Sequence, residues 1–186
     1  MDISNSDQSR SRVGRDQAGR DIHHVYNYKP TAMSELIDKY ENELENESFL
    51  NEIIEELQHL TSKAEHDVRG LHDKLESSGR LDALSVALTA KESAAKELLR
   101  LPNAKSAQKI YSLVLGNMLT SFSLRVAPLI QEGKPRSEVD AAVQEYVIDP
   151  AYQLLEKNPM CLNHLHMLGL YYFLAGNCHI SWDKIC

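Results

Sequence analysis

Cysteine and histidine, the side chains that most often bind zinc or act in nucleophilic catalysis, gather in the C-terminal part of the chain. The group consists of Cys161, His164, His166, Cys178 and His179. Zinc needs such ligands to converge on one tetrahedron, yet His164 and His166 would point to different sides of a helix, and the adjacent Cys178 and His179 do not easily share a tetrahedron. The pattern also lacks a nucleophile, a base and an orienting group that meet. We therefore expect packed side chains here and predict no catalytic residue, no metal site and no cofactor.

Glycine, arginine and aspartate repeat as a unit near the N-terminus. The unit occurs at 14–16 and 19–21, and the residues after it alternate as in a half-buried strand. We predict a short β-strand or hairpin over 13–28. Because a two-stranded element is marginal alone, we expect it to pair with a copy of itself or with the rest of the protein; a linker that happens to repeat three residues is the alternative. The residues predicted to mediate this association are Gly14, Arg15, Asp16, Gly19, Arg20, Asp21, Ile22 and Tyr26.

The overall charge argues against a general nucleic-acid binder. The chain of 186 residues has a formal net charge of −7, and the acidic excess lies in residues 31–100, so only the N-terminal region offers a local basic face. The sequence has no window of about 18 uninterrupted apolar residues, so we predict no membrane span. The polar residues 1–12 do not resemble a signal peptide, and we expect a disordered tail there. With three cysteines, the chain is expected to be cytoplasmic.

From residue 31 onward the sequence is typical of helices. We predict a mainly α protein in which a helical domain over 31–186, a bundle with one long amphipathic helix, follows the short Gly-rich β-element. The long helix is predicted from a heptad stripe over 48–76, with charged residues such as Glu56 and Lys74 on the opposite face. It is either an ordinary member of the bundle or one strand of a two-chain coiled coil. The residues predicted to form a seam between copies are Leu50, Ile54, Leu57, Val68 and Leu71.

Three successive aromatic residues, at 171–173, lie late in a predicted helix over 160–175, and a short extended tail follows. Consecutive aromatics cover more than one side of a helix, so we expect this helix to be buried between neighbours. The only tryptophan, Trp182, alternates with Ile180 in the tail. This pattern predicts either a plug against the last helices or a surface for a partner. The residues assigned to this role are Tyr172, Gly176, Asn177, Cys178, His179, Ile180 and Trp182.

Two segments resemble the C-terminal domains of bacterial ABC-three-component systems. They are Gly-Arg-Asp-Gln-Ala-Gly-Arg-Asp-Ile-His at 14–23 and Gly-Leu-Tyr-Tyr-Phe-Leu-Ala-Gly-Asn-Cys-His-Ile-Ser-Trp at 169–182. In that family a variable effector region precedes a Gly-Asp or Gly-Arg-Asp β-element and a helical domain. The resemblance implies antiviral defence against phage, with an ABC ATPase and a small middle component as partners. This chain departs from the family pattern because nothing enzymatic precedes its β-element.

Together these features predict a non-enzymatic assembly subunit that forms a homo-oligomer and docks partners from the same operon. Those partners are the ABC ATPase, the middle component or an effector. The alternative is an antitoxin- or repressor-like regulator that uses its Arg-rich N-terminus on DNA. Arg10, Arg12, Arg15 and Arg20 suit phosphate contacts, whereas the acidic segment that follows them opposes this alternative.

Overall fold

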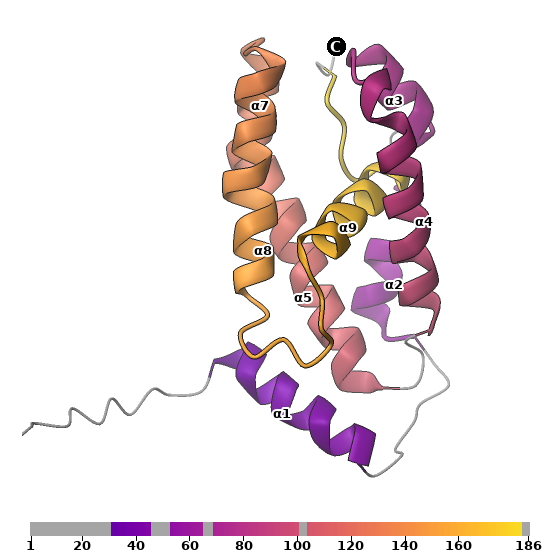
Figure 1. Ribbon diagram of the computed structural model, residues 1–186, viewed down its shortest axis with the longest axis vertical. Coiled ribbons are helices and arrows are strands. Elements are labelled where there is room, and N and C mark those ends of the chain that lie inside the picture. The colour runs from indigo at the N-terminus through magenta and orange to yellow at the C-terminus, as the bar shows by residue number, and fades with distance from the viewer. Residues whose placement is uncertain (1–30, 46–52, 65–68, 101–103, 184–186) are drawn as a thin grey trace, which may run out of the picture.

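All regular structure that the computed structural model describes is helical, which confirms the predicted mainly α class (Figure 1). The description covers residues 31–45, 53–64, 69–100 and 104–183. The tail predicted at 1–12 and the β-element predicted at 13–28 lie outside these residues. In chain order the described elements are α1 (Ala32–Glu45), α2 (Glu55–Thr61), α3 (Leu71–Ser77), the 3₁₀ turn η1 (Leu81–Ala83), α4 (Leu84–Arg100), α5 (Lys105–Ser121), the π-helical turn η2 (Phe122–Val126), α6 (Ala127–Gln131), α7 (Arg136–Val143), the π-helical turn η3 (Gln144–Ile148), α8 (Asp149–Gln153) and α9 (His164–Gly176).

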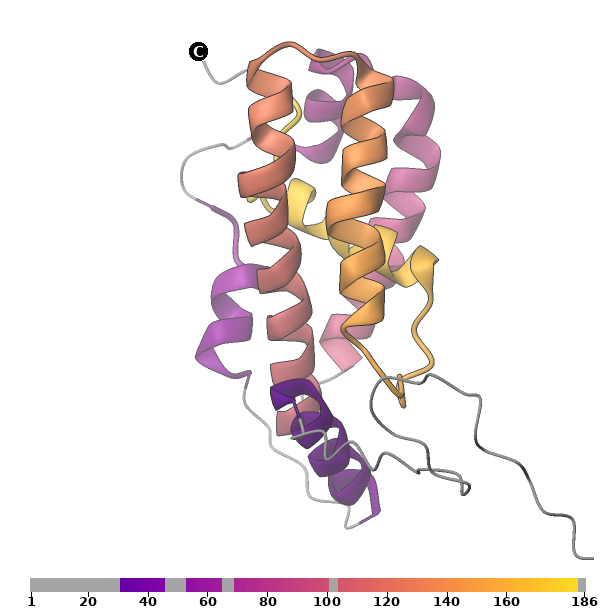
Figure 2. The same ribbon diagram turned by 90° about the vertical axis from the view of Figure 1, so that its left-hand side faces the viewer.

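Two antiparallel arms form a long hairpin on one side of the molecule (Figure 2). The first arm runs through α5, η2 and α6, and after a turn at 132–135 the second arm returns through α7, η3 and α8. α9 crosses between this hairpin and α4, and its most extensive packing is on α4 (Figure 1). α1 and α2 pack against α5. The helix α9 is therefore enclosed by elements that come earlier in the chain.

Each arm of the hairpin contains a proline that the helix accommodates by widening. A proline ring clashes with the carbonyl group four residues earlier and supplies no amide hydrogen. In η2 the amide of Ala127, the residue before Pro128, donates to the carbonyl of Phe122, five residues back. The turn η3 repeats this arrangement before Pro150. Both arms thus continue beyond their prolines because a π turn displaces the clashing carbonyl group.

The long helix predicted over 48–76 is wrong. α2 ends at Thr61, and Ser62 is extended with φ −74° and ψ 155°. α3 begins at Leu71, after Gly70, which is extended with φ −71° and ψ 169°. A heptad pattern reports which residues are buried, but it does not report whether the backbone between them remains helical. Here the chain leaves the helix at 62–64, where a backbone hydrogen bond joins it to a distant segment, from the Ala64 amide to the Asn177 carbonyl.

The residues assigned to a seam between copies have different surroundings. Leu57 and Leu71 are buried in the chain's own core, with exposed fractions of 2% and 3%. Ile54 is extended just before α2 and packs partly against the same core. Leu50 and Val68 lie outside the described residues. At the described positions, therefore, the stripe packs inside one chain and does not run along a continuous coiled-coil helix.

The core of the domain is built around α9. Met167, Leu170 and Leu174 are at most 2% exposed, and the arms of the hairpin and α4 surround them. The helical stretch Lys105–Gln131 has the length and apolar composition of a membrane-crossing helix. Core helices of globular domains meet the same criterion, and Leu115 and Met118 in this stretch have no exposed surface.

Small residues allow α4 and α9 to approach closely. Ala87, Ala90 and Ala94 are buried on the side of α4 that contacts α9. A Cβ atom added at Gly169 of α9 would lie 2.7 Å from the carbonyl oxygen of Ala90 and 3.3 Å from the Cβ atom of Ala94. A backbone carbonyl group cannot rotate away as the end of a side chain can. The crossing of these two helices therefore requires glycine at 169.

We predict that Gly169→Ala lowers the free energy of unfolding by about 1–3 kcal/mol, because α4 and α9 must separate to relieve the contact. Gly116→Ala is the matched control. Gly116 also lies inside a helix, but no atom lies within 4 Å of a Cβ atom added there, so this change should stabilise the protein by about 0.5–1 kcal/mol. Urea denaturation followed by circular dichroism measures both, and equal effects would contradict the close approach.

Candidate functional site

The tail at 177–183 is fastened to the segment 61–80, and these two segments form what we call the C-terminal clasp. The tail runs between α3 and α7 after α9 ends (Figure 1). The Asn177 carbonyl accepts from the Ala64 amide (2.9 Å), and the Asn177 side chain donates to the Thr61 carbonyl (2.9 Å). The ring nitrogen Nε2 of His179 donates to the Ser62 carbonyl (2.9 Å). The break between α2 and α3 therefore supplies the backbone groups that bind the tail.

Lys74 of α3 is the buried centre of the clasp. Its side chain has no exposed surface, and its Nζ donates to the carbonyls of Ala175 (3.0 Å) and Ile180 (2.9 Å). The first is one of the last carbonyls of α9, which have no partner within their own helix. A cation there also interacts favourably with the helix dipole. The sequence pattern had placed Lys74 on the solvent face. The available signal in the sequence was its spacing, three residues after Leu71 and directly before Leu75, both of which are buried.

α9 ends one step later than the sequence suggested. Gly176 is still helical, and the left-handed residue that stops the helix is Cys178, with φ 69°. The amide of His179 donates to the Leu174 carbonyl (2.9 Å), which closes the helix end. The Sγ atom of Cys178 lies 3.4 Å from the Arg69 carbonyl, to which it donates. Cys178 and His179 are thus engaged with backbone groups of the clasp.

Trp182 is buried against the aromatic residues of α9, which is the arrangement expected of a plug. It is 5% exposed, and its Nε1 donates to the hydroxyl of Tyr171 (2.6 Å). The ring centroids of Tyr171 and Tyr172 lie 5.7 and 6.1 Å from that of Trp182. The guanidinium of Arg80 lies 5.8 Å from the same ring, a cation–π distance.

Four charged side chains surround this aromatic group. Arg80 donates to Asp140 (3.0 Å), and Arg136 donates to Asp140 (3.1 Å) and twice to Asp82 (2.6 and 2.8 Å). The hydrogen bond from Arg136 lowers the pKa of the Asp82 carboxyl. A cavity of about 220 Å³ lies beside them, partly lined by Tyr172. Each carboxylate here is matched by a guanidinium, so the arrangement supports the packing of Trp182 without bringing a nucleophile to a base.

The cysteine and histidine residues of the predicted group do not converge. Cys161, His164 and His166 lie at the start of α9, and Cys178 and His179 lie beyond its other end. From His166 the helix α9 runs ten further residues to Gly176 before Cys178 and His179 follow, a rise of about 15 Å. Asn163 caps the helix in a reciprocal capping box with His166. His164 packs on Tyr152 with 4.2 Å between ring centroids. These residues therefore cannot form one zinc site.

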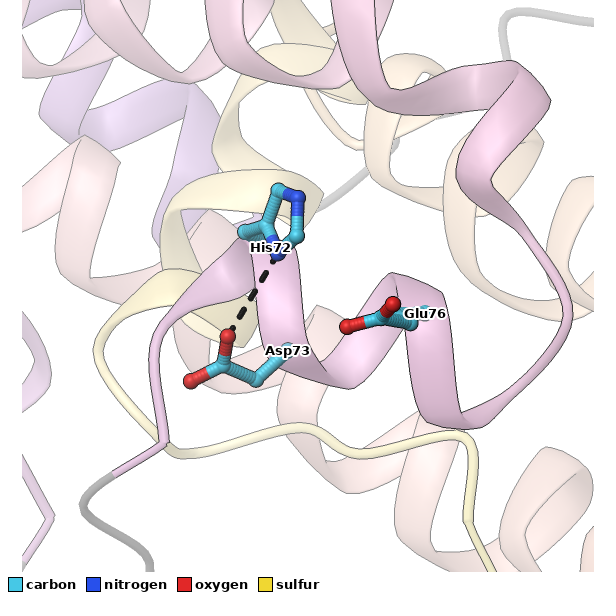
Figure 3. A group of neighbouring side chains, drawn as sticks. All are labelled: His72, Asp73 and Glu76. Carbon is cyan, nitrogen blue, oxygen red and sulfur yellow. Dashed lines mark ion pairs between the residues drawn. The ribbon is translucent and has the colours of Figure 1, made fainter.

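A different group of possible metal ligands lies on α3. The side chains of His72, Asp73 and Glu76 offer ligand atoms that all lie within 4.8 Å of one another. Figure 3 shows the three side chains on one turn of the helix, with the His72 ring directed at Asp73. All three are exposed. Surface groups with this spacing are common without a metal, so the geometry by itself assigns no ion to them.

We predict that Lys74→Met destabilises the protein by about 1–3 kcal/mol, because the buried Ile180 carbonyl loses its donor and the Ala175 carbonyl keeps only backbone amides. The tail should loosen as well, which would shift the fluorescence of Trp182 to the red. The control is Lys63→Met at an exposed position of the same clasp, where the change should stay within about 0.5 kcal/mol. Equal effects of the two substitutions would show that the buried ammonium group does not hold the tail.

Two buried tyrosines predict the behaviour of the protein at high pH. Burial raises the pKa of Tyr171, and burial beside Glu97 raises that of Tyr111. Below the ordinary tyrosine pKa of 10.0, neither the folded nor the unfolded state is ionised at these positions. Above it the unfolded state releases both protons and the folded state keeps them. The free energy of unfolding should then fall by about 1.4 kcal/mol per pH unit for each tyrosine.

The absorbance of tyrosinate at alkaline pH measures this effect. Of the eight tyrosines, at least Tyr111 and Tyr171 should remain protonated until the protein unfolds. Their absorbance should then appear together with the loss of helical circular dichroism. Titration of all eight tyrosines in a protein that is still folded would contradict the burial of these two hydroxyls.

The part of the chain that contains these features matches a known protein family. The family model for C-terminal domain 9 of the ABC-three component (ABC-3C) systems matches residues 70–182. This range begins at the residue before α3 and ends at Trp182, so it contains Lys74, α9 and most of the tail. Neither the curated proteins nor the solved structures give a match. Because the matched range covers more than half of the chain, the chain belongs to the family of C-terminal domain 9 of the ABC-three component systems.

Proposed function

We propose that this chain is a non-enzymatic assembly subunit of an ABC-three-component system that serves antiviral defence in the cytoplasm. The observation that carries the proposal is that the polar side chains of the clasp form hydrogen bonds within the chain itself. Lys74, Asn177 and His179 are bound to backbone carbonyls, and the Trp182 indole is bound to Tyr171. Side chains engaged in this way fix the shape of the domain, so the matched region is suited to presenting a rigid surface.

A groove between α1, α5 and α8 is the surface that we propose for docking. It has a volume of about 840 Å³ and is lined mainly by apolar atoms. Leu113 of α5 is 42% exposed beside it, and Gly116 leaves the wall one turn further along without a side chain. A glycine inside a helix costs about 1 kcal/mol relative to alanine. An apolar helix of a partner subunit that packs against this bare stretch would account for that cost, as in other helix-in-groove complexes.

The partners that we propose are the ABC ATPase, the middle component or an effector encoded beside this chain. Family membership supports this choice over the antitoxin- or repressor-like regulator. That alternative depends on the arginines at 10–20, which lie outside the described residues. Binding to the ATPase or middle component is a prediction that the following experiment addresses.

We predict that the tagged chain, co-expressed with the neighbouring genes, copurifies with the ATPase or the middle component. Leu113→Glu should reduce the yield of that complex at least tenfold, because it places a charge at the rim of the groove. Leu165→Glu is the matched control, since Leu165 is 62% exposed but lies on α9, away from the groove. Capture that survives Leu113→Glu would exclude the groove. A wild-type chain that captures neither named partner would contradict the assembly role.

A further inference from the structure

The outer side of α4 carries an apolar stripe that no described helix covers. Within the described residues α4 packs chiefly on α9, with smaller contacts to η1 and α3. It lies at one edge of the molecule, with α9 on its inner side (Figure 1). On the outer side Leu81, Leu88 and Leu99 are 45%, 47% and 72% exposed. Leu81 belongs to η1, which leads directly into α4.

The spacing of this stripe is that of a helix pair. The stripe comprises Leu81, Ser85, Leu88, Glu92, Ala95 and Leu99, separated by alternating steps of four and three residues. Such steps keep side chains on one line along a helix and pack against the same pattern in a partner helix. The buried alanines of α4 face α9 from the other side. The side of α4 away from these alanines thus exposes three leucines beside Ser85 and Glu92, whereas Ala95 packs partly against the chain's own core.

We propose that this stripe is the self-association surface of the protein and that a second copy of α4 packs on it in antiparallel orientation. The order of the residues favours that orientation. In a symmetric antiparallel pair, Leu81 lies opposite Leu99 of the second copy, and Leu88 lies opposite Glu92. A parallel pair would instead place the two Glu92 carboxylates against each other, which is unfavourable.

Charges beside the stripe complement one another only in the antiparallel pair. Asp82 flanks the beginning of the stripe, and Lys96 flanks its end on the same side of the helix. Two-fold symmetry then brings Asp82 of each copy to Lys96 of the other. Arg136 already orients Asp82 through two hydrogen bonds, and Glu92 orients Lys96 at 2.6 Å. Both groups are already ion-paired within the chain, so the contact between copies would join two existing ion pairs.

The length of the stripe sets the expected strength. The residues from 81 to 99 extend over about 28 Å of helix and make up less than three heptads. Free-standing coiled coils typically have three to four heptads or more. We therefore expect a dimer that dissociates in the micromolar range. This inference rests on the proposed assembly role, and it replaces the predicted seam at 50–71 by a seam at 81–99.

Sedimentation equilibrium of the full chain, over concentrations that rise well above the micromolar range, tests the surface. The wild type should approach twice the monomer mass of 21.0 kDa, and Leu88→Glu should weaken the dimer at least tenfold. If Leu88→Glu loses its helical circular dichroism, Leu99→Glu at the more exposed position takes its place. Leu124→Glu is the matched control, because Leu124 is 69% exposed on η2 and should leave the dimer intact. A monomeric wild type, or a dimer that both stripe substitutions leave unchanged, overturns the proposal.

Disulfide trapping tests the orientation. In a background with Cys161, Cys178 and Cys186 replaced by serine, a Leu81→Cys chain mixed with a Leu99→Cys chain should give a crosslinked pair. The Leu99→Cys chain alone should not crosslink, because its two copies lie at opposite ends of an antiparallel pair. Crosslinking of Leu99→Cys with itself would establish the parallel arrangement and overturn this one. Copurification of the ATPase or middle component is measured separately, so loss of the dimer with partner capture preserved would refute only the stripe.

Discussion

A buried ammonium group joins the two parts of the chain on which this fold depends. Lys74 reaches from α3 to carbonyls on both sides of the point where α9 ends. Without the ammonium group the buried Ile180 carbonyl would lose its donor, which is costly in a protein interior, and the Ala175 carbonyl would keep only backbone amides such as that of Cys178 (3.2 Å). Because one donor fixes both the helix end and the tail, the position of Trp182 follows from it. The Arg80 and Arg136 cluster then packs on an indole that is already in place.

The polar side chains of the clasp and the exposed apolar side chains have different roles in this domain, and this difference supports the proposed assembly role. The polar side chains of the clasp form hydrogen bonds to backbone atoms of the same chain. Several large apolar side chains instead remain at the surface, among them Leu88 on α4 and Leu113 on α5. Apolar surface that stays in contact with water is a source of free energy for association. The family match covers both of these helices and the part of the clasp that contains Lys74 and Trp182.

Sequence patterns were sufficient to predict features that depend on residues close together in the chain. Helix periodicity gave the mainly α class, and the lone tryptophan beside a helix end gave the buried plug at Trp182. The patterns were insufficient where a contact joins distant residues. The heptad stripe does not show that the backbone leaves the helix at Ser62, because the groups that bind it there, on Asn177 and His179, lie more than a hundred residues away. Lys74 was misplaced for the same reason, since its two acceptors lie 101 and 106 residues further along the chain.

The same long separations determine when the domain can close during synthesis. When the ribosome has made α3, α4 and the hairpin, the helix α9 that packs between them has not yet been synthesised. Loop closure across a hundred residues carries an entropic cost that is recovered only when the native contacts form. The alanine face of α4 and the ammonium group of Lys74 therefore wait, without their native partners, until residues 164–183 emerge. A message truncated before that point yields a chain that lacks α9 and the tail, and with them the contacts that complete the core.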